Sequence, residues 1–211
     1  ETAVNLVMDA NPVIGERVIV FGQGIVGLLT TALLREFPLE KLVVVDPVPM
    51  RRDAALALGV DAASAPKEAD MDDFDLALEL SGVPDALNAA IEKVGFGGRV
   101  IVGSWYGQKP VSLDLGGRFH RERIQIISSQ VSTIAPKFGA RWDKSRRFNL
   151  VWEMLGRVYR RSNLHHKEGD YRAEKHRLSM TKSEEHHVHC CRKTGFCCPT
   201  FFDRGRLGRR E

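Results

Sequence analysis

The sequence predicts an α/β fold: a doubly wound parallel sheet of about six strands with helices on both faces, followed by a disordered C-terminal tail. Three observations carry this prediction. A glycine-rich turn joins a buried strand to a helix near residue 22, strands and helices then alternate, and the composition changes near residue 160. Alternating strands and helices indicate parallel strands, because each parallel pair needs a crossover connection.

The glycine-rich turn follows an apolar run, residues 18–21, which predicts a short buried strand, and it leads into a helix expected over residues 25–35. Gly22, Gly24 and Gly27 form the pattern G-x-G-x-x-G of dinucleotide-binding turns. The first glycine allows the tight turn, the second lets a pyrophosphate approach the backbone, and the third lets helix and strand pack closely.

A second apolar run, residues 42–45, ends in Asp46. An acid at the end of the second strand accepts hydrogen bonds from the adenosine ribose hydroxyls of a bound dinucleotide. The start of the helix offers unpaired N–H groups to the phosphates, so Gln23, Ile25 and Val26 join the predicted site. A lone glycine pattern is weak evidence. Because strand, glycines, helix, second strand and acid follow in order, a dinucleotide site is favoured over a structural turn.

Apolar periodicity predicts the other elements. Helices are expected over residues 2–10, 51–58, 85–94 and 148–158, and strands over residues 60–62, 75–80, 99–103 and 124–128. Residues 95–98 are expected to end the helix 85–94, and the last helix is expected to bury Leu150, Val151, Met154, Leu155 and Val158.

Right-handed crossovers favour the strand order 3-2-1-4-5-6. Ligands of such sheets bind at the carboxyl ends of the strands, near the switch point. The glycine turn, Asp46, Ser81-Gly82 and residues 103–106 all follow predicted strands, so this edge of the sheet is the expected binding site.

Charge and cysteine content divide the chain in two. Residues 1–159 carry 18 Lys and Arg against 20 Asp and Glu, whereas residues 160–211 carry 13 against 7. The basic character therefore belongs to the tail, and a nucleic-acid partner is not expected. The sequence contains no run of about 18 apolar residues, so no membrane span is predicted. All four cysteines lie beyond residue 189, so the body has no disulfide framework, which suits a cytoplasmic protein.

The tail, residues 160–211, has only seven Leu, Ile, Val or Phe among 52 residues, which predicts disorder. Seven His and Cys side chains lie between His186 and Cys198 and could bind zinc or copper, although adjacent Cys pairs do not match zinc-finger spacing. Adventitious metal capture is favoured over a physiological site. The basic run 204–210 is expected to be solvated.

Several segments together resemble the zinc-type medium-chain alcohol dehydrogenase superfamily, over its cofactor-binding (Rossmann) domain only. They are GERVIVFGQGIVG (15–27), VVVD (43–46), ALALGVD (55–61), DLALELSG (75–82) and GGRVIVG (97–103). The resemblance covers residues 1 to about 158. It implies NAD(P)-dependent hydride transfer between an alcohol carbon and nicotinamide, a small-molecule alcohol or carbonyl substrate, zinc in the full-length family, and a homo-oligomer formed through this domain.

The same resemblance assigns further residues. Arg51 is similar to the basic residue that flanks the adenosine. Ser81, Gly82, Gly103 and Ser104 are similar to the wall along the nicotinamide half of the cofactor. NAD is expected to bind better than NADP, because the carboxylate of the ribose-binding acid would repel a 2′-phosphate.

Glu1 is similar to a glutamate that ligates zinc in the polyol dehydrogenase branch. An ordinary capping or linker role is the alternative for this residue. The resemblance implies that the family's N-terminal catalytic domain carries the other zinc ligands, and this domain is expected to be missing from the chain. The expected organisation is a junction helix from a missing catalytic domain (1–13), a dinucleotide-binding domain (14–159) and a disordered, non-native tail (160–211) of the kind that a frameshifted reading frame produces.

Two function classes stay open. The first is a dehydrogenase, represented by its cofactor-binding half and inactive by itself. The second is a nucleotide-binding sensor or regulatory module without catalysis. The long connection after the fifth strand favours the first class, since Trp105 and Tyr106 could line the substrate end of the cleft, or else cover the sheet edge. His120 could transfer protons, but a surface position in a charged run is the more common arrangement.

Overall fold

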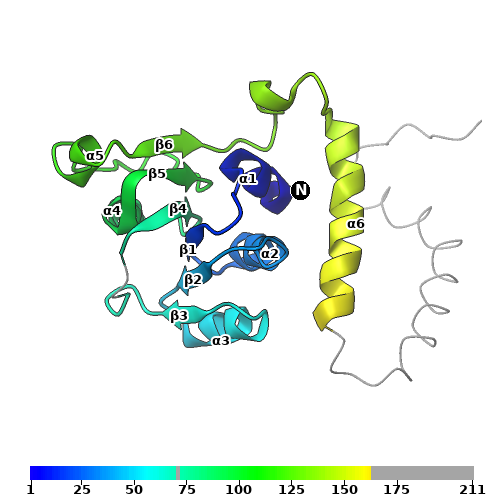
Figure 1. The fold of residues 1–211 in the computed structure, drawn as a ribbon, viewed down its shortest axis with the longest axis horizontal. Coiled ribbons are helices and arrows are strands. Elements are labelled where there is room, and N and C mark those ends of the chain that lie inside the picture. The colour runs from blue at the N-terminus through cyan, green and yellow to red at the C-terminus, as the bar shows by residue number, and fades with distance from the viewer. Residues whose placement is uncertain (70–71, 163–211) are drawn as a thin grey trace, which may run out of the picture. The chain divides into compact units, whose positions relative to one another are not determined.

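The computed structural model describes residues 1–69 and 72–162, which belong to one compact unit, Glu1–Ser162 (Figure 1). The expectations for a disordered tail and for its His and Cys cluster lie outside the described residues. In the part that is described, no helix is long and apolar enough to cross a bilayer.

A six-stranded sheet forms the centre of the unit. Its strands are β1 (Arg17–Phe21), β2 (Lys41–Val45), β3 (Ala62–Ser64), β4 (Phe74–Glu79), β5 (Val94–Val102) and β6 (Gln125–Ser128). All pairs are parallel, and the order β3-β2-β1-β4-β5-β6 confirms the predicted one. Val20 is paired with Val44 on one side and with Leu78 on the other, so the switch point lies between β1 and β4.

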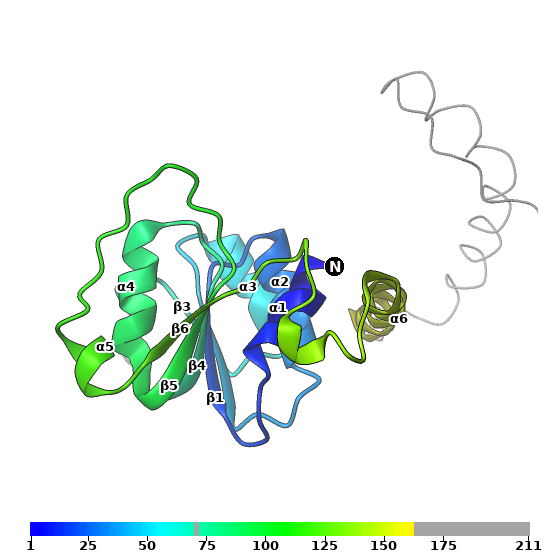
Figure 2. The ribbon, with the colours of Figure 1, turned by 90° about the horizontal axis from the view of Figure 1, so that it is seen from above.

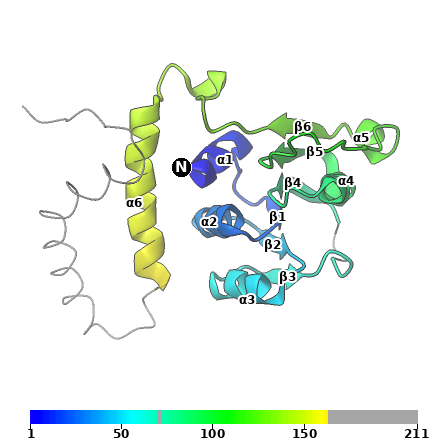
Figure 3. The same cartoon turned by 180° about the vertical axis from the view of Figure 1, so that it is seen from behind.

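Helices cover both faces of the sheet (Figure 2). They are α1 (Thr2–Ala10), α2 (Ile25–Leu34), α3 (Pro49–Ala57), α4 (Pro84–Lys93), the short α5 (Arg118–Arg121), the 3₁₀ turn η1 (Pro136–Phe138) and α6 (Lys144–Ser162). One face carries α1, α2 and α3, and the other carries α4. The last helix, α6, packs against α1 and α2 (Figure 3).

Alternating side chains of each strand enter two separate apolar cores. On β1, Val18 and Val20 pack in the core beneath α1 and α2, whereas Ile19 and Phe21 pack in the core beneath α4. The inner parts of β1, β2 and β4 are mostly apolar because both of their faces are buried. Each such side chain contributes about 1.5 to 3 kcal/mol to the stability of the unit by leaving water.

The third strand begins two residues later than predicted. Val60 is buried in the core, but the ladder with β2 begins only at the pair Val43–Ala62. Before that pair, the side chain and the N–H of Asp61 both bond the backbone of Leu42, at 2.7 and 2.9 Å. Val60 therefore contributes to the core without pairing, and the strand begins after it.

The helix before residues 95–98 ends as predicted, at Lys93, but the strand expected to begin at Arg99 already begins at Val94, so β5 runs through these glycines. The pairing of β4 with β5 shifts register between Phe74 and Leu76, which marks a bulge. A Cβ on Gly98 would lie 2.3 Å from Cγ1 of Val94, so the bulge requires glycine there. Glycine interrupts a helix, but here it permits a bent strand.

The last helix is longer than the predicted span of 148–158. It begins at Lys144 because Asp143 caps it, accepting a hydrogen bond from the N–H of Arg146 at 2.7 Å. Val151 is buried as predicted, whereas Leu155 is exposed, which corrects its expected position. The third helix also begins early, at Pro49, because proline suits the first turn of a helix.

Candidate functional site

The glycine turn after β1 is so tightly packed that side chains do not fit at two of its positions. Gly22 has φ 92°, and a Cβ there would lie 2.7 Å from the backbone nitrogen of Ser81. A Cβ on Gly27 would lie 2.0 Å from the carbonyl oxygen of Gly22. These atoms belong to the backbone and cannot turn aside. The first and third glycines therefore have the packing roles that the sequence predicted.

Gly24, by contrast, borders open space. No atom lies within 4 Å of a Cβ built on it, and its φ of −69° is accessible to any residue. Gly24 is the N-cap of α2, no side chain caps this end, and the first intrahelical bond of the helix runs from the N–H of Leu28 to Gly24. The N–H groups of the first turn, which includes Ile25 and Val26, have no intrahelical acceptor. The arrangement suits an anionic group such as a phosphate.

Asp46 follows β2 directly and is almost completely buried, with 1% exposure. Its Oδ2 accepts a hydrogen bond from the N–H of Gln23 at 2.7 Å, and its Oδ1 accepts one from Val48 at 2.8 Å. Arg51 lies 3.7 Å away and is half-exposed, so the carboxylate has a cationic neighbour. Arg52 donates to the carbonyl of Asp46 at 2.8 Å.

The side chain of Gln23 points into the protein instead of toward the sheet edge. It is fully buried, and its Oε1 accepts a hydrogen bond from Oγ1 of Thr31 at 3.1 Å. Its Nε2 has no hydrogen-bond partner among the described residues. Gln23 thus supports the turn from inside, and its backbone N–H fixes Asp46.

The carboxyl end of β4 carries a buried acid that the sequence analysis missed. Glu79 is fully buried, and its Oε1 accepts hydrogen bonds from the N–H and the hydroxyl of Ser81, at 2.7 and 2.5 Å. The hydroxyl of Tyr106 donates to Oε2. An acid at the carboxyl end of a strand, directly after the apolar run Leu76–Leu78 and two residues before Ser81, is the signal that could have revealed it.

Glu79 changes the acidity of its neighbour. Burial first, then the hydrogen bond to Glu79 and its negative charge, raise the pKa of Tyr106 well above its ordinary value. Tyr106 therefore stays protonated and keeps donating to the carboxylate. The next turn is fixed similarly, since the hydroxyl of Ser104 accepts a bond from the N–H of Gly82 at 2.8 Å. The predicted residues after β4 and β5 thus lie together at one edge.

Three other positions after the strands have different environments. A Cβ on Gly103 would lie 2.4 Å from Cδ2 of Leu6, so this glycine makes room for α1. Trp105 is 91% exposed beside it. His120 is exposed in α5.

A zinc ion does not fit at Glu1 in this arrangement. Oε1 of Glu1 accepts two hydrogen bonds from the guanidinium of Arg147, at 2.6 and 3.2 Å. A cation bound to this carboxylate would lie beside a second, buried cation. Within residues 1–69 and 72–162, no three His, Cys, Asp or Glu side chains come close enough to hold a metal.

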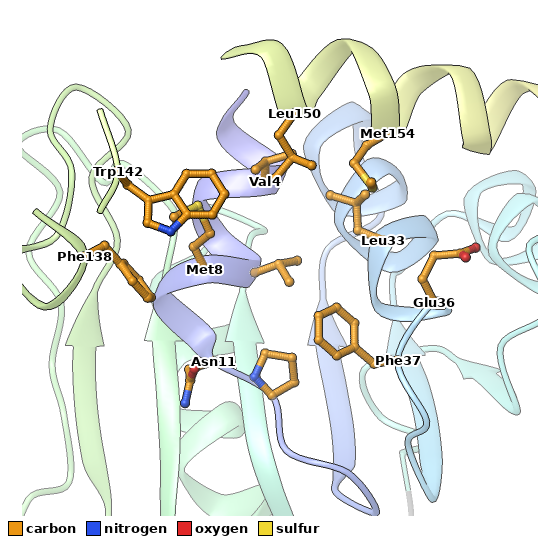
Figure 4. A pocket seen from close by; sticks show the side chains of 12 residues that line it. Val4, Met8, Asn11, Leu33, Glu36, Phe37, Phe138, Trp142, Leu150 and Met154 are labelled. Atoms are coloured by element: carbon orange, nitrogen blue, oxygen red, sulfur yellow. The ribbon is translucent and has the colours of Figure 1, made fainter. Parts of the chain in front are cut away.

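A separate apolar cavity of about 310 Å³ lies between α1, α2, η1 and α6 (Figure 4). Its walls include Met8, Phe37, Phe138, Trp142 and Met154. No residue of the glycine turn and no predicted site residue lines it. The cavity is therefore distinct from the carboxyl edge of the sheet.

The strand order and the glycine turn at the switch point define a Rossmann fold, the class of domain that binds dinucleotides. A family model described as zinc-binding dehydrogenase matches residues 26–148. The chain belongs to this family.

Curated relatives are dehydrogenases. The chain is 26% identical to D-guloside 3-dehydrogenase of Escherichia coli (strain K12) over 167 residues, which cover 74% of this chain and 48% of that protein. It is 34% identical over 99 residues to L-threonine 3-dehydrogenase of Saccharopolyspora erythraea, covering 42% of this chain and 29% of that one. The chain spans about half the length of D-guloside 3-dehydrogenase and less of L-threonine 3-dehydrogenase.

Solved structures share the fold. Benzyl alcohol dehydrogenase from Acinetobacter calcoaceticus superposes with a TM-score of 0.61 at 20% identity, over 74% of this chain and 44% of that one. A protein from Sinorhizobium meliloti 1021, solved with bound NADP, superposes with a TM-score of 0.56 at 18% identity, over 61% and 41% of the two chains.

Proposed function

We propose that this chain binds NAD, in preference to NADP, as the cofactor-binding half of a zinc-type dehydrogenase acting on a small-molecule alcohol or carbonyl. The observation that carries the proposal is the turn at Gly24: open space beside an uncapped helix start, between two glycines that admit no side chain. The N–H groups of Ile25, Val26 and Gly27 would face the pyrophosphate.

Each half of the site has its own role in the proposal. Asp46 would accept hydrogen bonds from the adenosine ribose through its remaining lone pairs, with Arg51 beside the adenosine. Ser81, Gly82, Gly103 and Ser104 would border the other nucleotide. When bound, the nicotinamide supplies the hydride chemistry, and the protein supplies its position and its electrostatic surroundings.

Preference for NAD rests on the negative charge of Asp46. A 2′-phosphate would approach a carboxylate that is held in place by two backbone N–H groups and cannot turn away. Arg51, at 3.7 Å, offsets part of this repulsion, so the difference in affinity between NAD and NADP is expected to be moderate. A homo-oligomer formed through this domain stays a prediction.

Isothermal titration of the 211-residue chain with NAD⁺ and with NADP⁺ tests the proposal. Saturable binding of NAD⁺, tighter than that of NADP⁺, is the expected result. Tighter binding of NADP⁺ would contradict the role given to Asp46. No binding of either dinucleotide would contradict the proposed function as a whole.

A further inference from the structure

The side chain of Arg147 has a hydrogen-bond acceptor for each of its N–H donors. It lies in the first turns of α6 and has no exposed surface. A guanidinium has five N–H donors, and here all five are used. The acceptors are Oε1 of Glu1 (twice), Oδ1 of Asn5, and the carbonyl oxygens of Val131 and Thr133.

The guanidinium therefore joins three separate segments: the start of α1, the start of α6 and the loop 129–133 after β6. The loop is fixed a second time through Ser129. Its hydroxyl donates to Oδ2 of Asp9 at 2.7 Å and accepts from Nδ2 of Asn5 at 3.0 Å. The loop 129–133 thus has two side-chain anchors, and both reach α1.

The loop lies at the carboxyl edge of the sheet. The N–H of Ser129 bonds the carbonyl of Val102 at 2.9 Å, so the loop begins next to the turn that carries Gly103 and Ser104. In a doubly wound sheet the two nucleotides of a dinucleotide lie on opposite sides of the switch point. The adenosine half belongs to β1–β3 and the other half to β4–β6, where this loop lies.

We propose that Arg147, with Glu1 as its counter-ion, is a positioning residue that holds the loop 129–133 in place for the nicotinamide half of the cofactor. This inference rests on the proposed binding of NAD. Glu1 accordingly serves the arginine and not a metal. Buried charge explains the pairing, since a guanidinium without exposure requires a nearby anion.

The experiment compares two ligands on the full chain. ADP-ribose contains every part of the cofactor except nicotinamide, and NADH adds the nicotinamide. Arg147→Lys keeps the charge but loses the planar fork that reaches Glu1 and both carbonyls. We expect the Kd for NADH to rise about tenfold and the Kd for ADP-ribose to change less than about twofold.

Arg157→Lys is the matched control, because Arg157 lies on the same helix in an exposed pair with Glu153. It should leave both Kd values unchanged. Equal weakening of NADH and ADP-ribose by Arg147→Lys would show a merely structural role and overturn the proposal, and so would no weakening of either. Failure of the wild-type chain to bind ADP-ribose would instead overturn the proposed function, and the inference with it.

Hydrogen exchange of the wild-type chain is a second test, and it requires no variant. NADH should protect the amides of residues 129–133, whereas ADP-ribose should protect only those of the glycine turn. If both ligands protect the loop equally, or neither does, the loop does not serve the nicotinamide half. Glu1→Gln, which removes the counter-ion but keeps one acceptor, should weaken NADH binding selectively and by less than Arg147→Lys does.

Discussion

Oδ2 of Asp46 lies 2.7 Å from the backbone nitrogen of Gln23, so the acid after β2 is hydrogen-bonded to the glycine turn after β1. The two halves of the proposed adenosine site therefore form one structural piece before any ligand arrives. A carboxylate held in this way needs no reorganisation to meet a ribose, which favours binding. The same bond makes Asp46 a structural residue as well as a proposed binding residue.

Asp46→Ala should affect both the stability of the fold and the choice of cofactor. It leaves the N–H groups of Gln23 and Val48 without an acceptor, and the buried N–H of Gln23 alone should cost about 1 to 3 kcal/mol of unfolding free energy. It should also narrow or reverse the preference for NAD⁺ over NADP⁺. Titration calorimetry and chemical denaturation measure the two effects. Asp53→Ala, an exposed change in α3, is the control; an unchanged cofactor preference in Asp46→Ala would contradict the assignment.

Two glycine substitutions separate folding from binding. Gly27→Ala places a Cβ against a carbonyl oxygen and should lower stability by about 1 to 3 kcal/mol. Gly24→Ala adds a methyl group in open space, so the melting temperature should stay close to that of the wild type while dinucleotide affinity falls at least about tenfold. Undiminished affinity in Gly24→Ala would show that no phosphate approaches this backbone.

Tyr106→Phe removes one donor from the buried carboxylate of Glu79. The unfolding free energy should fall by about 1 to 3 kcal/mol. Because the pKa of Tyr106 is raised in the folded state, this stabilisation is complete below pH of about 10 and is lost as the pH rises beyond it. Ultraviolet titration of the three tyrosines should show one late ionisation, absent from Tyr106→Phe. Ionisation of all three tyrosines at the same pH would contradict the hydrogen bond from Tyr106 to Glu79.

The ion pair of Glu16 and Arg99 should stabilise the fold in a way that depends on pH. Partial burial acts to raise the pKa of Glu16, but the bonds from Arg99 and from the N–H of Val13 outweigh it, so its pKa lies below 4.5. The stabilisation is therefore present above pH 4.5 and lost as the pH falls through the folded pKa. Glu16→Gln should cost about 1 kcal/mol at pH 7 and nothing at strongly acidic pH. Denaturation curves at both pH values check this. A stability difference between the wild type and Glu16→Gln that persists in acid would refute it.

The chain by itself should not oxidise alcohols. Hydride transfer in this family's manner needs a metal to polarise the oxygen, and no three suitable ligands come together in the described residues. We expect no NADH formation above background with NAD⁺, zinc and a panel of primary, secondary and polyol alcohols. A steady rate that disappears with a chelator would show that the chain completes a metal site by itself.

The sequence by itself determined the order of the sheet and the position of the glycine turn and Asp46 at the edge where the binding site is proposed. Apolar runs separated by helical periods specify parallel strands, because strands of this kind must be buried on both faces. Gly22, Gly27 and Asp46 could be identified because each has a backbone requirement or a charge that few other roles need. These are local properties, and local spacing is sufficient to predict them.

Only the tertiary structure decided what each polar side chain bonds. Glu1 and Arg147 are 146 residues apart, and no local pattern indicates that the arginine occupies the carboxylate expected to bind zinc. Glu79 and Tyr106, and likewise Asn5 and Ser129, meet only because β4, β5 and β6 bring their ends together beside α1. The physical reason is that burial of a charge or an amide requires a partner, and the fold selects that partner from distant parts of the chain.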